Sequence, residues 1–275
     1  MVIIFLLLSM LVLEEILHRL NRGASFMDLD LAANSVEQVE GSDQKGLTRF
    51  LSWLRIVQLF TFGVLLAYIA TSAGVRLLST APGQLAGLLL LIQVVRILNR
   101  KVINQWSVLG MTVVLQVIIL LTLVFTGTGV GGFYTEAVHG NWLVSLTSFL
   151  VLFLLTVTMP FTGTYFFRLL SREGSGFYYF LPSLAYSEYW IRRFTRVAAM
   201  AALASMLLVV YYFLNSSFPV NETACHIVIV LILFTASYLF RNRLKLHHPQ
   251  AVLLVLLAWL IRIAWLLGGY RLFSG

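Results

Sequence analysis

The sequence predicts an all-α fold, a polytopic integral membrane helical bundle with seven or eight transmembrane helices. Hydrophobic residues make up 60% of the 275 residues, and charged residues make up only 11%, against about 25% in an average soluble protein. A soluble domain of this length cannot bury so much apolar surface in one core. A disordered chain would need low hydrophobicity and high charge, and the single cysteine excludes a disulfide scaffold.

Seven apolar stretches are long enough to cross a bilayer, because a transmembrane helix needs about 20 residues. We predict them at about 50–71, 78–98, 106–126, 142–160, 194–214, 225–240 and 251–269. A shorter apolar segment at 2–13 lacks the charged n-region and the cleavage site of a signal peptide. We interpret it as a short N-terminal helix, so that residues 1–275 form a single membrane domain.

Three connections between the predicted helices are longer than a simple turn. The first, at 23–48, is polar and acidic, the second, at 127–141, is rich in glycine, and the third, at 161–193, is rich in aromatic residues. The sequence contains no soluble domain and no internal repeat of the lengths that solenoids and propellers use. The chain is therefore predicted to be one bundle.

The basic residues predict the orientation of this bundle. Of the 19 lysines and arginines, Arg55 and Arg262 lie within predicted helices, and Arg76 and Arg271 lie at one set of helix ends. The others lie at the opposite ends: Arg19, Arg22, Lys45, Arg49, Arg96, Arg100, Lys101, Arg168, Arg172, Arg192, Arg193, Arg196, Arg241, Arg243 and Lys245. Because Lys and Arg collect on the cytoplasmic side, we predict this side to be cytoplasmic.

This orientation predicts a multi-pass protein of the inner or plasma membrane, with both termini external if the helices number eight. The first connection, at 23–48, and the third, at 161–193, are then cytoplasmic. The formal charge of +8 fits the attraction of a cytoplasmic face to anionic lipids. The expected partners are therefore the lipid bilayer and its anionic lipids, and no nucleic acid.

Ionisable groups within the predicted helices are informative, because they are costly in lipid. None of the acidic residues falls in the seven long stretches, and Glu14 and Glu15 only follow the short first helix. This argues against a transporter that needs a buried carboxylate. No lysine falls there either, which argues against a retinal pigment. Gln93 and Gln116 lie within two of the stretches, and we expect each to hydrogen-bond another helix.

Arg262 is the exception among the charged residues of the last predicted helices. Trp259 and Trp265 lie three residues to either side and can flank its guanidinium. Two interpretations stay open: Arg262 reaches the headgroups beside an interfacial tryptophan belt, or it is buried and binds an anionic lipid or a polar group. The candidate ligand or lipid site is therefore Arg262, Trp259, Trp265 and Gln116.

The segment 177–190 is dense in aromatic residues and is flanked by arginines. Such a segment would expose a large apolar patch in water. It is therefore expected to lie in the headgroup layer as an interfacial helix or to dock on a partner protein. Because Tyr, Trp and Arg dominate interface hot spots, the residues expected to carry this contact are Tyr186, Tyr189, Trp190 and Arg193.

The histidines predict neither a metal site nor a haem site. His139 and His226 lie at the edges of predicted helices, and His247 and His248 are adjacent in the sequence. Adjacent residues do not share a helix face, so they are poor joint ligands. We therefore expect no cofactor.

The last fifty residues resemble the end of exosortase-type membrane transpeptidases. In that family a cysteine opens a helix on the outer face and an arginine follows in the next helix, and Cys225 and Arg262 occupy such positions. The resemblance implies a thiol enzyme with Cys225 as its nucleophile. The segment Ala224-Cys225-His226 departs from the family's Cys-Ser-Gly, and no histidine follows Arg262. Because a thiol needs a base or a cationic neighbour to react, these departures favour an inert cysteine.

These observations favour a function without catalysis. The leading hypothesis is an integral subunit or scaffold of a larger inner-membrane assembly, with other membrane proteins as partners. The alternative is a small permease or lipid-handling protein with a polar site near Arg262. A third hypothesis is an exosortase-like membrane thiol enzyme that uses Cys225.

Overall fold

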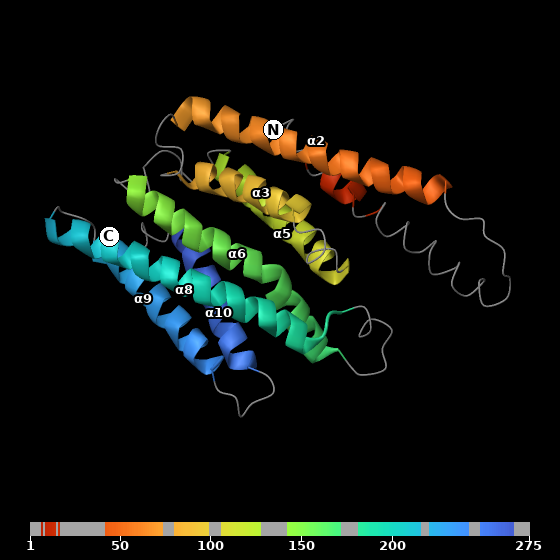
Figure 1. Cartoon of the computed structure of the whole chain (residues 1–275). Helices are drawn as coiled ribbons and strands as arrows, with labels where there is room; N and C mark the ends of the chain where they lie inside the picture. The colour runs from red at the N-terminus through yellow and green to blue at the C-terminus, as the bar shows by residue number, and fades with distance from the viewer. Residues whose placement is uncertain are drawn as a thin grey trace.

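The computed structural model describes residues 7, 9–14, 16, 42–73, 80–98, 106–127, 142–171, 181–215, 220–241 and 248–266. Nearly all of them are helical, and this part of the chain contains no strand. Figure 1 shows the helices arranged as a bundle. They are α2 (Ser42–Ala73), α3 (Ala81–Leu98), α5 (Trp106–Gly127), α6 (Trp142–Leu170), α8 (Leu184–Asn215), α9 (Val220–Leu239) and α10 (Pro249–Ala264).

Three of these helices contain stretches that are long and apolar enough to cross a membrane. They are Arg49–Ile69 in α2, Leu143–Leu170 in α6 and Leu184–Asn215, which is α8. Four helices contain shorter apolar stretches: Ala81–Ile97, Gly110–Leu123, Thr223–Leu239 and Pro249–Ala264. Helices whose surfaces are this apolar satisfy their backbone internally and suit a bilayer. The chain is therefore an all-helical membrane protein, as the composition predicted.

Several predicted boundaries were wrong. α2 begins at Ser42, so the end of the predicted loop at 23–48 is helical, while residues 23–41 lie outside the described part. α6 continues through Pro160 to Leu170, and α8 begins at Leu184, so the predicted connection at 161–193 shortens to 171–183. Hydropathy reports which residues are apolar, whereas a helix extends as far as its backbone N–H groups bond to the carbonyl oxygens four residues earlier.

The helices pack as two neighbouring groups. α2, α3 and α5 pack in chain order, while α6, α8, α9 and α10 form a second group in which α10 contacts both α9 and α6. The groups meet where α3 and α5 pack on α6. α2 lies at the edge of the bundle (Figure 1). It exposes large apolar side chains, among them Trp53, Phe60 and Tyr68, which is the surface that lipid contact favours.

The most extensive helix pair is α6 with α8, and small side chains explain it. The buried face of α8 includes Ala198, Ala202 and Ser205 at helical spacing. Small residues let two backbones approach closely, which drives helix association in lipid, where burial of apolar surface adds little. Across this interface the Thr147 hydroxyl donates a 3.2 Å hydrogen bond to the Ser205 hydroxyl.

Polar contacts hold together one end of this second group. The Arg168 guanidinium, near the end of α6, donates a hydrogen bond to the carbonyl oxygen of Leu181, which lies shortly before α8. The Glu188 carboxylate lies 2.5 Å from Nδ1 of His248, and both side chains are buried. The sequence had suggested a loop for Glu188. That was wrong, because α8 begins before it, and the residue joins the first turn of α8 to the start of α10.

Candidate functional site

At the opposite end of the same group, three helices bring polar side chains to one buried point. Arg262 lies near the end of α10 and is 1% exposed. Its guanidinium donates to the hydroxyl of Ser148 on α6. The same hydroxyl lies 3.3 Å from Nε2 of His226 on α9, and both Ser148 and His226 are buried. The sequence was compatible with a headgroup-facing or a buried Arg262 side chain, and in the structure the side chain is buried.

Cys225 belongs to the same point. It lies in the second turn of α9, which begins at Val220, and its side chain is buried. Arg262 interacts electrostatically with both Cys225 and His226. We call Ser148, Cys225, His226 and Arg262 the thiol–arginine cluster. A neighbouring guanidinium favours the thiolate form of a cysteine, whereas burial of the side chain disfavours it.

The two tryptophans beside Arg262 differ in their surroundings. The Trp259 indole N–H donates a 3.1 Å hydrogen bond to the hydroxyl of Thr156 on α6. Trp265 is 8% exposed and belongs to the core. The two indoles therefore pack within the bundle and do not form an interfacial tryptophan belt. The pair therefore packs α10 against its neighbours next to the thiol–arginine cluster.

No known protein explains this cluster by similarity. No family model, no curated protein and no solved structure matches the chain. The argument about function therefore rests on the geometry of the described residues.

A second buried polar group lies between α2, α3, α5 and the N-terminal helical residues 9–14. Glu14 Oε1 accepts hydrogen bonds of 2.7 Å from Nε of Arg55 on α2 and of 2.7 Å from a terminal nitrogen of Arg96 on α3. The carboxylate is 1% exposed. Glu14 lies outside the seven predicted stretches, as expected, and it continues the helical face of the buried residues Leu7 and Leu11. Its burial was not predicted from the sequence.

Three glutamine side chains complete this group, which we call the Glu14 network. Arg96 donates to the side-chain oxygens of Gln93, at 2.9 Å, and of Gln116 on α5, at 2.8 Å. Gln93 in turn donates to Gln58 on α2 at 2.9 Å. The expectation that Gln93 and Gln116 hydrogen-bond other helices is thus confirmed. Gln116 serves Arg96 and Gln93, and its suggested role in ligand binding stays a prediction.

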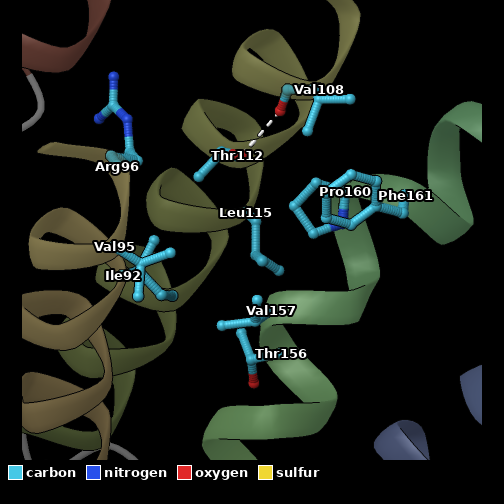
Figure 2. A pocket seen from close by; sticks show the side chains of 10 residues that line it. All are labelled: Ile92, Val95, Arg96, Val108, Thr112, Leu115, Thr156, Val157, Pro160 and Phe161. Atoms are coloured by element: carbon cyan, nitrogen blue, oxygen red, sulfur yellow. Dashed lines mark hydrogen bonds between the residues drawn. The ribbon is translucent and has the colours of Figure 1, made fainter. Parts of the chain in front are cut away.

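The space beside the Glu14 network is small. Figure 2 shows a cavity between α3, α5 and α6 that Arg96 borders, with Leu115, Val157 and Pro160 among its walls. Its volume is about 20 Å³, which is room for about one water molecule. The Thr112 hydroxyl in its wall donates a 2.7 Å hydrogen bond to the Val108 carbonyl oxygen of its own helix, so it is not available to a molecule in the cavity. This cavity cannot hold a substrate, so we assign the Glu14 network a structural role.

The predicted aromatic contact residues lie at the start of α8, and residues 177–180 of that segment fall outside the described part. Trp190 stacks on Phe161 of α6, with ring centroids 6.1 Å apart, and the Arg193 guanidinium lies 5.6 Å from the Trp190 ring centroid. Tyr189 is 55% exposed, and Tyr186 packs edge-on to Trp190. Trp190 therefore packs against the core, while Tyr189 lies at the surface. The expected contact of this segment with headgroups or with a partner stays a prediction.

The described side chains include no group of three or more His, Cys, Asp or Glu residues that could hold a metal ion. The thiol–arginine cluster supplies one thiol and one imidazole, too few for a tetrahedral zinc site made of protein ligands. The cluster therefore offers a thiol, an imidazole and a guanidinium.

Sequence reasoning missed Ser148, Glu14, Arg55 and Arg96 as site residues. A signal for the Glu14 network was nevertheless present. Arg55 and Gln58 are three residues apart in one apolar stretch, and Gln93 and Arg96 are three apart in the next. Residues three apart share a helix face, so each helix carries one polar face within lipid. Ser148 gave a weaker signal, because small hydroxyl residues such as Ser145, Thr147 and Ser148 are common in membrane helices.

Proposed function

We propose that this chain is a membrane-embedded thiol enzyme in which Cys225 is the nucleophile. The observation that carries the proposal is the thiol–arginine cluster, in which Arg262 interacts electrostatically with Cys225 and donates to Ser148. A buried thiol ionises only when a cation offsets the loss of water. Arg262 is a cation near the buried thiol that offsets part of this loss, and the exosortase-like positions of Cys225 and Arg262 support the same hypothesis.

The chemistry that this arrangement supports is acyl transfer through a thioester. The Cys225 thiolate attacks a carbonyl carbon of a membrane-borne substrate, the bond to the leaving group breaks, and the leaving group takes a proton from water. The guanidinium of Arg262 is suited to stabilise the oxyanion that forms during the attack. Ser148 lies between the other two polar groups, because its hydroxyl contacts the imidazole of His226 and accepts from the guanidinium of Arg262. Water or an amine then cleaves the thioester.

The proposal includes the topology. We propose that all seven helices from α2 to α10 cross the inner or plasma membrane in alternating directions, with the basic ends cytoplasmic. The start of α6, the start of α9 and the end of α10 then lie together near the external face, which fits the polar contacts between them. An enzyme of this design would act on substrates that reach the outer leaflet.

Cys225 is the only cysteine of the chain, which makes the central test direct. The full-length protein is purified from cells that make it naturally, and adducts on residue 225 are identified by mass spectrometry. The wild type should carry an acyl or peptidyl thioester that neutral hydroxylamine removes. Cys225→Ser should accumulate the same group as a hydroxylamine-resistant ester, because a serine ester is cleaved more slowly. Cys225→Ala should carry none.

Two results would contradict the enzyme hypothesis. One is the absence of any adduct on the wild type and on Cys225→Ser when both are folded and correctly inserted. The other is a Cys225→Ala variant that retains the full cellular role of the protein. Together they would favour the non-catalytic subunit of a larger assembly.

The topology has its own test. In a Cys225→Ala background, single cysteines are introduced at 135 and at 245, in the connections 128–141 and 242–247, and are treated with a membrane-impermeant maleimide. Intact cells should label the cysteine at 135 and spare the cysteine at 245, while permeabilised cells should label both. External labelling at 245 would refute the proposed orientation.

A further inference from the structure

A groove between α8 and α9 lies far from the thiol–arginine cluster along α9. Its volume is about 490 Å³, and it is lined by Arg196 of α8 and by Phe234, Ser237, Tyr238 and Arg241, at the end of α9. Arg196 and Arg241 are both exposed. Both belong to the basic helix ends that we assign to the cytoplasmic side. The groove therefore opens at the level where the headgroups of the inner leaflet lie.

The charge of this groove is not neutralised by the described carboxylates. Glu14 and Glu188 are the only carboxylates among the residues whose side chains the structure describes. Glu14 pairs with Arg55 and Arg96, and Glu188 pairs with His248, all away from this groove. Two guanidinium groups thus face one opening without an acidic partner among the described residues. Such a site attracts an anion, and the guanidinium fork matches a phosphate.

A hydroxyl group adds a second polar feature. The Ser237 oxygen is shielded from solvent and has no hydrogen-bond partner in the structure. A buried hydroxyl without a partner costs free energy that a bound acceptor would recover. Ser237 lines the same groove as the two arginines.

The walls of the groove continue into an apolar surface. On α8, Met200 and Leu207 follow Arg196 along one helix face and are 64% and 59% exposed. On α9, Leu231 precedes Tyr238 by two turns on one face, and both are strongly exposed. A free phosphate makes no favourable contact with such an apolar surface, whereas the acyl chains of a lipid pack against it. The combined feature fits a molecule with a phosphate head and apolar tails.

We propose that this groove binds the phosphate of an anionic phospholipid of the cytoplasmic leaflet, with the acyl chains lying along α8 and α9. Basic pockets between transmembrane helices on the cytoplasmic side are typical sites for such headgroups. The inference is independent of the chemistry of Cys225. It uses the proposed orientation only to name the leaflet.

The test measures lipid binding to the delipidated full-length protein by native mass spectrometry in detergent. Phosphatidylglycerol is titrated against the wild type, against Arg196→Gln/Arg241→Gln, and against the matched control Arg49→Gln. Arg49 is also an exposed arginine at a basic helix end, but on α2. The apparent dissociation constant should rise at least about tenfold in the double variant and should be unchanged in the control. Phosphatidylcholine should bind the wild type at least about tenfold more weakly.

Several outcomes would overturn the proposal. They are an equal loss of affinity in Arg49→Gln, unchanged affinity in the double variant, or binding of phosphatidylcholine as tight as that of phosphatidylglycerol. Displacement of the lipid by an excess of inorganic phosphate would show a free-anion site. Thermal unfolding is measured for each variant, and the single variants Arg196→Gln and Arg241→Gln are titrated as well. A folding defect in the double variant therefore leaves the decision to the single variants.

Discussion

Replacement of Glu14 with Ala is expected to lower the free energy of unfolding by about 3–5 kcal/mol, which is the usual cost of removing one partner from a buried ion pair. The carboxylate bonds both Arg55 and Arg96, at 2.7 Å each, and is 1% exposed. Its removal leaves two buried guanidinium groups with less compensation. The measurement is unfolding of the full-length protein in mixed micelles, followed by loss of helical circular dichroism.

The control for this prediction is Val12→Ala, since Val12 lies on the same helical segment and is 51% exposed. It should change the unfolding free energy little. A double-mutant cycle then separates the ion pair from other effects. Glu14→Gln combined with Arg96→Gln should cost less than the sum of the two single changes, because the second change removes the charge that the first left unpaired. Additive losses would argue against a coupled network.

Replacement of Arg262 with Gln is expected to slow the alkylation of Cys225 about tenfold or more. The attacking species is the thiolate, and each 1.36 kcal/mol of lost charge stabilisation lowers its population tenfold. Arg262 is the cation that interacts with Cys225. The rate is measured with iodoacetamide by intact-mass spectrometry, which reports Cys225 alone because the chain has no other cysteine.

Two further variants separate the charge of Arg262 from its packing. Arg262→Lys keeps the charge and should retain much of the alkylation rate. Arg193→Gln removes an exposed arginine in the first half of α8, away from the thiol–arginine cluster. It should leave the alkylation rate unchanged, which controls for the change in net charge. If alkylation is as fast in folded Arg262→Gln as in the wild type, then Arg262 does not activate the thiol.

The helices themselves were largely predictable, because hydropathy is a local property. The stretches predicted at 78–98 and 106–126 match α3 and α5 closely. Two of the errors lie at polar helix ends, the start of α2 at Ser42 and the first turns of α8. Lipid contact no longer constrains those residues, so hydropathy carries no signal there. Helix propensity and packing decide the boundary instead.

The sequence by itself determined that this is a helical membrane protein, and it singled out Arg262, Gln93, Gln116 and Cys225 as unusual within apolar surroundings. These conclusions depend on composition and on spacing along the chain. Only the tertiary structure decided that Glu14 is buried between Arg55 and Arg96, and that Arg262 joins Ser148 and interacts with Cys225 and His226. Contacts across helices depend on how each helix is rotated about its axis and on which helices are neighbours. Both are set by side-chain packing over the whole bundle, because apolar surface faces lipid as readily as it faces another helix.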